Sequence, residues 1–179
     1  MRKTYNVNEI FFSLQGEGRN TGRCAVFIRF SGCNLKCSFC DTDFKSYREM
    51  TVDDIISAIS KWKKAGFVVL TEGEPTLQVD DTLIDALHAS GFYVAMESNG
   101  TRVPPQHLDW LTVSPKGSVV VTKCNELKFI FDGESMVDDA GIQADYYYLQ
   151  PCDVGDKAKN QVILQACISY ILSHPKWRL

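Results

Sequence analysis

The sequence predicts an α/β protein that forms an open partial barrel of about six strand–helix units. Short apolar segments alternate with helix-like segments at the start and the end of the chain, which is typical of a parallel sheet. Polar residues and glycines follow the ends of the apolar segments, and α/β barrels carry their active sites at that end of the strands. A full eight-unit barrel takes about 250 residues, so a chain of 179 residues has room for fewer units.

The first half of the chain predicts three extended segments and two helices. Thr51 is a candidate N-cap because Asp54 stands three residues later, so a helix is expected from Thr51 to Gly66. A second helix is expected at residues 80–89. The extended segments are residues 8–14, 24–30 and 67–71.

The second half of the chain is predicted to contain five strands but only one helix. Pro104 and Pro105 break any long helix, so the connection there must be short, and the helices after Val113 and Phe131 are expected to be trimmed. The last helix is expected to start at Asp156 or Asn160 and to end at Ser173, with a further strand beginning at Trp177. The other strands are expected at residues 92–96, 110–113, 125–131 and 146–149.

Composition describes an ordinary globular protein. Hydrophobic residues make up 45% and charged residues 23% of the chain, and the net charge of −3 gives no reason to expect nucleic acid or an anionic membrane as a partner. No segment approaches ~20 consecutive apolar residues, and the N-terminus lacks an apolar signal core. We therefore expect a single cytoplasmic domain over residues 1–179.

Three cysteines in one short loop carry the strongest chemical signal. Cys33, Cys37 and Cys40 stand at a Cys-x3-Cys-x2-Cys spacing with no fourth cysteine close by. Structural zinc sites and electron-transfer clusters each want four protein ligands. Three thiolates would leave one iron of a 4Fe–4S cluster open for a small molecule, whereas a zinc knuckle completed by Asp41 is the alternative.

The remaining cysteines do not suggest disulfides, because the total of seven is odd and there is no export signal. Cys24 and Cys167 are predicted to be small buried side chains. Cys124 and Cys152 stand beside loop motifs, so each either reaches a pocket or has no role in one.

Three further groups of polar residues leave their roles open. Arg29 lies in an apolar strand, so it either is buried with an anionic partner or reaches the surface. Glu126 and Lys128 share one face of a strand, and we favour an interior position for the pair. Glu17 lies between Gly16 and Gly18, which form either a plain turn or a close approach to a small ligand.

The cysteine spacing and the words around it resemble the radical S-adenosylmethionine (SAM) superfamily and, within it, the 7-carboxy-7-deazaguanine synthase family. The resemblance runs from about Asn8 to the last residue and is carried by residues 15–18, 27–33 and 40–42. It implies an open partial barrel of the radical SAM kind, with a 4Fe–4S cluster, SAM and Mg2+ as cofactors. It also implies a flavodoxin-like reductant and a homodimer.

The activity that the resemblance implies is that of a lyase in queuosine and deazapurine biosynthesis. Its substrate is 6-carboxy-5,6,7,8-tetrahydropterin, and its product, 7-carboxy-7-deazaguanine, forms by ring contraction with loss of ammonia. A 5′-deoxyadenosyl radical derived from SAM abstracts hydrogen from C6 of the pterin. Two other classes stay open, namely a glycyl-radical-enzyme activating protein and a non-catalytic iron–sulfur electron carrier.

The resemblance also assigns site residues. It gives the cluster to Cys33, Cys37 and Cys40, and it gives Mg2+ to Thr42. The residues implied to contact SAM are Phe39, Cys40, Asp41, Gly73, Glu74, Glu97, Asn99, Ser114, Pro115, Lys116, Gln150, Pro151, Cys152 and Asp153. The residues implied to contact the substrate are Leu14, Gln15, Gly16, Glu17, Arg29 and Thr71, with Arg29 binding the substrate carboxylate.

Two departures from the family pattern stand out. The first glycine of the Gly-Gly-Glu-Pro motif is Glu72 here, so either this position keeps an ordinary backbone conformation or SAM binding is modified. The last residues, 177–179, resemble the family's penultimate segment, which a short tail follows. We therefore expect a C-terminal tail of about 10 residues to be missing from this sequence.

Overall fold

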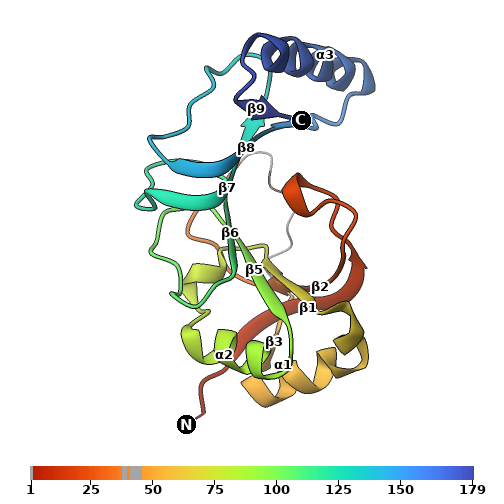
Figure 1. The fold of residues 1–179 in the computed structure, drawn as a ribbon, viewed down its shortest axis with the longest axis vertical. Helices are drawn as coiled ribbons and strands as arrows, with labels where there is room; N and C mark the ends of the chain where they lie inside the picture. Colours follow the sequence, from red (N-terminus) through yellow and green to blue (C-terminus); the bar gives the residue numbers. More distant parts are fainter. Residues whose placement is uncertain (1, 38–39, 41–45) are drawn as a thin grey trace.

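One nine-stranded sheet curves into an open barrel in this computed structural model, which describes residues 2–37, 40 and 46–179 (Figure 1). The strands are β1 (Tyr5–Leu14), β2 (Cys24–Phe30), β3 (Arg48–Met50), β4 (Phe67–Thr71), β5 (Tyr93–Ser98), β6 (Trp110–Val113), β7 (Lys123–Phe131), β8 (Gln143–Pro151) and β9 (Trp177–Arg178). The α-helices are α1 (Val52–Ile59), α2 (Asp81–Ala89) and α3 (Lys157–Ser173), and the 3-10 helices are η1 (Gly18–Asn20), η2 (Ser60–Ala65) and η3 (Pro75–Leu77).

The strand order is β3-β1-β2-β4-β5-β6-β7-β8-β9. From β2 through β9 each neighbouring pair is parallel, whereas β1 pairs antiparallel with both β2 and β3. The predicted open parallel barrel is therefore confirmed. The sequence did not predict β3, because three residues with exposed or half-exposed side chains carry little strand signal.

Helices cover the sheet mainly in its first half, and α3 lies at the other end of the molecule (Figure 1). The described segments between β5, β6, β7 and β8 contain no helix, as the two prolines and the predicted trimming require. Thr51 and Asp54 form the predicted capping box at the start of α1. The predicted helix to Gly66 is interrupted, since α1 gives way to η2, in which Trp62 has a non-helical φ of −110°.

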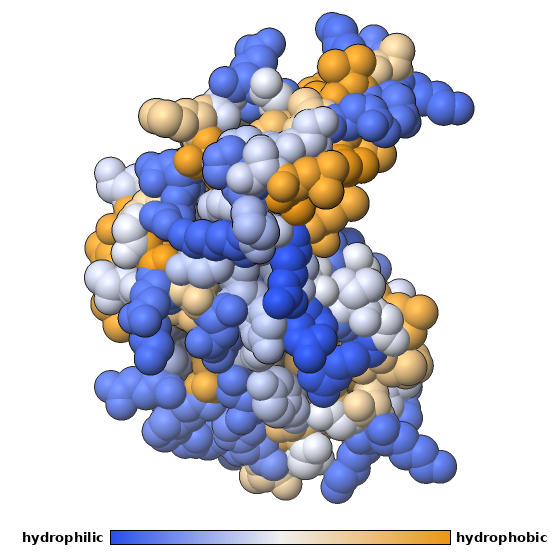
Figure 2. All heavy atoms as spheres, turned by 45° about the horizontal axis from the view of Figure 1, so that its top comes forward, coloured by the Kyte–Doolittle hydropathy of each residue, from blue (hydrophilic) through white to orange (hydrophobic). Residues whose placement is uncertain are grey.

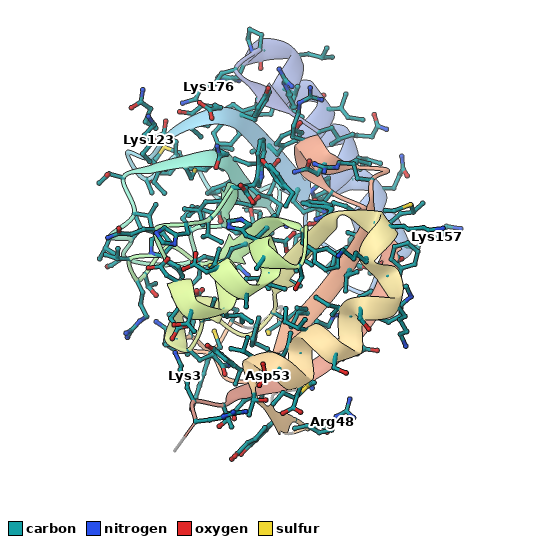
Figure 3. The ribbon with its side chains drawn as sticks, turned by 60° about the horizontal axis from the view of Figure 1, so that its bottom comes forward. Lys3, Arg48, Asp53, Lys123, Lys157 and Lys176 are labelled. Carbon is teal, nitrogen blue, oxygen red and sulfur yellow. The ribbon has the colours of Figure 1, made fainter. Side chains whose placement is uncertain are left out.

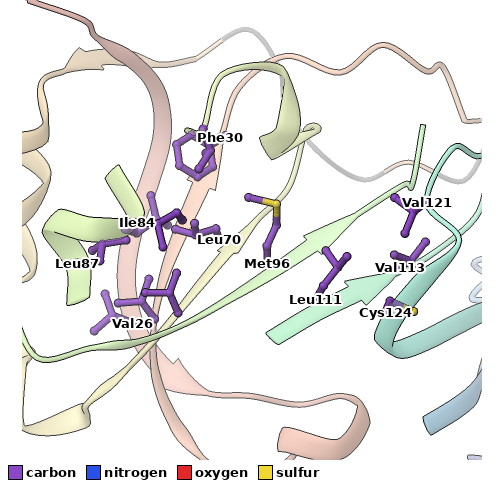
Figure 4. Packing of buried hydrophobic residues seen from close by; sticks show 14 of the residues in the cluster. Val26, Phe30, Leu70, Ile84, Leu87, Met96, Leu111, Val113, Val121 and Cys124 are labelled. Atoms are coloured by element: carbon purple, nitrogen blue, oxygen red, sulfur yellow. The ribbon is translucent and has the colours of Figure 1, made fainter. Parts of the chain in front are cut away.

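The hydrophobic core lies on both faces of the sheet because alternate residues of each strand point to opposite sides. Between the sheet and the helices, Ile84 and Leu87 of α2 point towards Val26, Leu70 and Phe30 of the strands (Figure 4). The residues of the second, smaller cluster come from the intervening strand positions and fill the inside of the barrel: Ala25, Phe27, Phe67, Val69 and Ala95. The second cluster forms the floor above which a pocket can open.

Charged side chains lie around the periphery. Lys3, Arg48 and Asp53 lie at one end of the molecule and Lys123 and Lys176 at the other (Figure 3). Exposed ion pairs such as Lys3–Asp80 contribute little to stability by themselves. In the described part of the chain, no helix combines the length and the apolar character needed to cross a membrane.

Asp80 joins the start of α2 to β1. Its carboxylate accepts hydrogen bonds from the Leu83 N–H (3.2 Å), the Tyr5 hydroxyl (2.8 Å) and the Lys3 ammonium (2.6 Å). Burial alone would raise the pKa of Asp80, but these hydrogen bonds outweigh it and hold the pKa below its ordinary value.

Substituting Asp80→Ala is expected to lower the free energy of unfolding by about 2 kcal/mol. The helix loses its N-cap, and the hydroxyl of the fully buried Tyr5 loses its acceptor. Because the folded-state pKa is lowered, this stabilisation is present above the ordinary carboxyl pKa of about 4 and is lost as the pH falls through the lowered pKa. Urea unfolding at neutral and acidic pH measures it. A difference between the two proteins that stays constant down to the acid limit would contradict the assignment.

Two cysteine predictions have different outcomes. Cys167 is fully buried against the core, as predicted. Cys24 is exposed, so the prediction of a buried side chain was wrong. The physical reason is its place as the first residue of β2, opposite the exposed Leu14 at the end of the β1–β2 pair.

Candidate active site

A pocket of about 550 Å³ opens at the carboxyl ends of the parallel strands. Figure 2 shows the molecule hollowed on one side, with hydrophilic side chains gathered beside the hollow. The pocket brings together most of the residues that the sequence assigned to cluster, SAM and substrate. The predicted residues that line it are Leu14, Gln15, Gly16, Glu17, Arg29, Cys33, Cys37, Cys40, Thr71, Gly73, Glu97, Asn99, Ser114 and Lys116.

The three cysteines of the predicted cluster site all line this pocket as free thiols. The Leu35 N–H donates to the Cys33 sulfur at 3.4 Å, and the Cys40 N–H donates to the Cys37 carbonyl at 3.2 Å. Among the described residues, no three His, Cys, Asp or Glu side chains converge on one metal position. A 4Fe–4S cluster does not require its thiolates to meet at one metal position, because each thiolate binds a separate iron. Three thiols facing one pocket fit that group.

Some site predictions fall outside the described residues. Phe39, Asp41 and Thr42 belong to that part of the chain, so the SAM contacts of the first two and the Mg2+ role of Thr42 stay predictions.

The cluster loop, defined here as residues 31–37 and 40, is tied to the loop after β4. The Glu74 N–H donates to the Gly32 carbonyl at 2.9 Å, and the Gln78 side-chain amide donates to the Ser31 carbonyl at 3.0 Å. Gly73 has a φ of +55°, and a Cβ there would collide with the carbonyl oxygens of Gly32 and Phe30. Only glycine fits this close approach of two backbones.

A second tie joins the cluster loop to the loop after β5. The Asn99 side-chain amide donates to the Asn34 Oδ1 at 3.0 Å, and the Asn34 amide donates to the Thr101 hydroxyl at 2.8 Å. Asn34 was not predicted from the sequence as a site residue. A polar residue between two predicted cluster ligands was the available signal.

Glu74 lies beneath the pocket rather than on its wall. Its carboxylate is fully buried and accepts four hydrogen bonds. The donors are the N–H of Thr76 (3.1 Å), the hydroxyls of Thr76 (2.6 Å) and Ser98 (2.9 Å), and the N–H of Asn99 (2.7 Å). The described donors thus occupy this carboxylate, which joins the loops after β4 and β5. Its predicted direct contact with SAM stays a prediction.

Glu97 forms the centre of a hydrogen-bonded group on the substrate side. Its carboxylate accepts from the Gln15 side-chain amide (3.0 Å) and from the Thr71 hydroxyl (2.8 Å). Gln15 in turn accepts from the Glu17 N–H through its side-chain oxygen. The segment with two glycines is therefore held in place by its own polar side chains rather than forming a plain exposed turn.

Lys128 lies inside the barrel, as favoured from the sequence, but its partner is not Glu126. Its ammonium pairs with Glu17, which is 111 positions earlier in the chain. Burial lowers the pKa of Lys128, but the carboxylates Glu97, Glu17 and Glu126 outweigh it, so the net pKa is raised. Lys128 is therefore a protonated cation among carboxylates.

Glu126 supports the glycine segment from below. Its carboxylate accepts from the Arg19 N–H at 2.8 Å, and a Cβ on Gly18 would collide with it. The φ of Gly18 is +64°, so both conformation and space require glycine here. Burial raises the pKa of Glu126, with the Arg19 N–H and Lys128 opposing the shift.

Arg29 is half-buried and pairs with carboxylates. The two alternatives from the sequence, burial with an anionic partner and a position at the surface, were therefore each partly right. Its Nη1 donates to Glu9 at 3.0 Å, and its Nε lies 2.7 Å from Glu72 Oε1. The guanidinium carbon stacks over the Phe11 ring at 4.7 Å from its centroid. Phe11 itself stacks on Phe27, with ring centroids 5.0 Å apart and planes 9° apart. An aromatic wall therefore lies beside the one arginine predicted to bind an anion.

Glu72 takes up an unusual backbone conformation. Its φ is +59°, so the alternative of an ordinary backbone at this position was wrong. A left-handed conformation costs a non-glycine residue roughly 1 kcal/mol or more. Glu72 also lines the pocket, where no ligand role was predicted for it.

One predicted segment is not brought into the pocket. Gln150, Pro151, Cys152 and Asp153 are absent from its described lining, and so is Pro115. Asp153 instead accepts from the Gly155 N–H (2.8 Å) and the Asn160 side chain (2.6 Å), which shapes the approach to α3. Their contact with SAM stays a prediction. Pocket residues that the sequence missed include Phe11, Phe27, Ser98 and Thr112.

Comparisons with known proteins agree with this geometry. The family model of the radical SAM superfamily matches residues 27–115. A 7-carboxy-7-deazaguanine synthase from Bacteroides thetaiotaomicron is 48% identical over 100% of this chain and 93% of that protein. The protein of the same name from Caulobacter vibrioides is 43% identical over 98% of this chain and 94% of its own. The crystal structure of QueE from Escherichia coli matches with a TM-score of 0.77 and 28% identity, covering 98% of this chain and 92% of that one.

The partial barrel and its pocket with three cysteines therefore define a radical SAM enzyme. Such an enzyme carries a 4Fe–4S cluster and uses SAM. The chain belongs to the 7-carboxy-7-deazaguanine synthase family, whose activity is that of a Mg2+-dependent lyase. Of the classes left open by the sequence, the activating protein and the electron carrier are thereby set aside.

Proposed function

We propose that this chain converts 6-carboxy-5,6,7,8-tetrahydropterin into 7-carboxy-7-deazaguanine with loss of ammonia. The observation that carries the proposal is that one pocket is lined both by Cys33, Cys37 and Cys40 and by an arginine beside an aromatic wall. A volume of about 550 Å³ is within the usual range for a ligand site.

On the cofactor side, the three cysteine thiolates hold the cluster, and Thr42 binds Mg2+. When bound, cluster and SAM together supply a carbon radical that abstracts hydrogen. Gly73, Asn99, Ser114 and Lys116, which all line the pocket, hold SAM. Glu74 acts by fixing the loops that carry these groups.

On the substrate side, the two ends of the pterin meet different chemistry. The aminopyrimidinone end carries N–H donors, and the carboxylates of Glu17 and Glu97 supply acceptors. The carboxylate end meets Arg29, whose planar guanidinium suits bidentate recognition. Gln15 and Thr71 orient Glu97, and the Phe11–Phe27 pair shields one side of the pocket from water.

We propose a flavodoxin-like reductant, supported by the exposure of Cys40 on the cluster loop. We propose a homodimer, supported by the exposed Val162 and Leu172 on α3. Free thiols throughout the described chain support a cytoplasmic location, where thiols stay reduced.

Product formation tests the proposed reaction. The reconstituted enzyme is incubated anaerobically with SAM, Mg2+, a chemical reductant and the carboxy-tetrahydropterin. We expect 7-carboxy-7-deazaguanine and ammonia in equal amounts, over many turnovers. SAM cleavage that never yields this product would overturn the proposal while leaving the radical SAM class intact.

Arg29→Ala is expected to raise KM for the carboxy-tetrahydropterin by about tenfold or more, because a charge-assisted pair is worth about 1.5–3 kcal/mol. Slow SAM cleavage without substrate should continue, since Arg29 lies outside the cluster ligands. Steady-state kinetics and 5′-deoxyadenosine release separate the two effects. Arg19→Ala, which removes an exposed arginine from η1, is the control. An unchanged KM in Arg29→Ala would refute the role in carboxylate binding.

A further inference from the structure

Glu72 combines three properties that call for a functional explanation. It has a positive φ of +59°, it lines the pocket, and its carboxylate lies against the arginine assigned to the substrate carboxylate. Strained residues of this kind persist where the surrounding structure holds them, and they cluster at functional sites. A glycine would fit this backbone without strain.

Arg29 already has two carboxylate neighbours before any ligand arrives. Glu9 faces it across the β1–β2 pair, and its contact with Nη1 is an aligned hydrogen bond of 3.0 Å. Glu72 comes from the loop that follows Thr71, the neighbour of Arg29 on β4. Its Oε1 lies 2.7 Å from Nε, but among the described atoms this nitrogen has no aligned hydrogen bond. The contact between Glu72 and Nε is therefore an ion pair rather than an aligned hydrogen bond.

A substrate carboxylate would bring a third negative charge to one guanidinium. The two carboxylates already outnumber its single positive charge, so one of them has to move away from Arg29 when the substrate carboxylate binds. Glu9 is held on a strand and is not among the residues that line the pocket, whereas Glu72 stands in the pocket on a loop. The side chain of Glu72 is 23% exposed, so water can receive its carboxylate when it leaves Arg29.

We propose that Glu72 is a specificity-determining residue that competes with the ligand carboxylate for Arg29. Before a ligand binds, it occupies the Nε edge of the guanidinium, where a carboxylate ligand would bind. Small anions gain too little binding free energy from Arg29 alone to displace Glu72. A ligand that also makes contacts along its pterin ring gains enough to displace it. This inference rests on the proposed role of Arg29 and adds the selection among anions.

Binding of two fluorescent probes tests the inference. The probes are 6-carboxypterin, which carries the carboxylate, and pterin, which lacks it, titrated into the reconstituted enzyme with SAM and no reductant. For Glu72→Gln we expect about fivefold tighter binding of 6-carboxypterin, equivalent to about 1 kcal/mol, and unchanged binding of pterin. Glutamine keeps the size and the backbone of this position, so the change reports on charge alone.

Two further variants make the result specific. Glu134→Gln removes the same charge from an exposed loop after β7 and should leave both probes unchanged. Glu9→Gln should strengthen 6-carboxypterin binding less than Glu72→Gln does. Inorganic phosphate should compete with 6-carboxypterin more effectively in Glu72→Gln than in the wild type.

The outcomes separate the inference from the proposed function. Unchanged or weaker 6-carboxypterin binding in Glu72→Gln overturns the inference, because Glu72 would then be neutral or would help to orient Arg29. Equal gains in Glu72→Gln and Glu134→Gln also overturn it, since net charge alone would explain them. If Arg29→Gln leaves 6-carboxypterin binding intact, the proposed role of Arg29 fails instead.

Discussion

Replacing Cys37 by alanine is expected to abolish SAM cleavage and to leave the protein without a complete 4Fe–4S cluster. Cys37 is the middle thiol of a loop that supplies all three predicted ligands to one pocket. With two thiolates left, a second iron loses its protein ligand, and the cluster becomes labile. Anaerobic reconstitution followed by iron and sulfide analysis measures the cluster, and 5′-deoxyadenosine release measures the cleavage.

The matched controls are cysteines outside the pocket. Cys24 is exposed at the start of β2, so Cys24→Ala should keep both the cluster and the activity. Cys167 is fully buried in the core, so Cys167→Ala should cost about 1 kcal/mol of stability but keep the cluster. A Cys37→Ala protein with a full cubane and normal SAM cleavage would show that the cluster ligands are wrongly assigned.

Glu74→Ala is expected to lower the free energy of unfolding by about 3 kcal/mol. The substitution leaves four buried donors of the loops after β4 and β5 without their acceptor. Because the same loops carry Gly73 and Asn99, SAM binding should weaken as well. Denaturant unfolding gives the first effect, and equilibrium binding of SAM to the reconstituted protein gives the second.

Glu49→Ala serves as the comparison, since Glu49 is an exposed glutamate on the edge strand β3. It should change stability by no more than about 0.5 kcal/mol. If Glu74→Ala were as stable as Glu49→Ala, the four hydrogen bonds could not be what joins the two loops. If stability fell but SAM affinity did not, Glu74 would support the fold without shaping the SAM site.

Local signals predicted the elements that depend on neighbouring residues. Thr51 and Asp54 lie within one turn of each other, so the capping box could be predicted from spacing alone. The parallel strands followed from apolar runs and from the polar segments after them. The interruption of the first helix near Trp62 was not predicted, because tertiary packing overrides a continuous apolar periodicity.

Contacts between residues far apart in the sequence limited how much of the site could be predicted from the sequence. The interior position of Lys128 could be expected from its strand, but its pairing with Glu17 depends on how β7 and η1 meet in space. The inward orientation of Glu74 depends on the chain near Ser98 and Asn99 in the same way. The motif showed that Glu72 was unusual, but only the fold brings its carboxylate to Arg29.

The order of strands in the sheet has a consequence for how the chain acquires its fold. β3 pairs with β1 at the edge of the sheet, β4 pairs with β2, and every later strand lies next to the strand that precedes it in the chain. During synthesis, every strand from β4 onwards therefore emerges after its partner and can add to an existing edge. The connections between β5, β6, β7 and β8 contain only 9 to 11 residues, so closing each of them costs little conformational entropy, whereas those from β2 to β4 and from β8 to β9 are longer. The sheet can therefore grow from the N-terminal hairpin in the direction of translation. The strands on either side of the cluster loop in the sequence can pair before α3 leaves the ribosome.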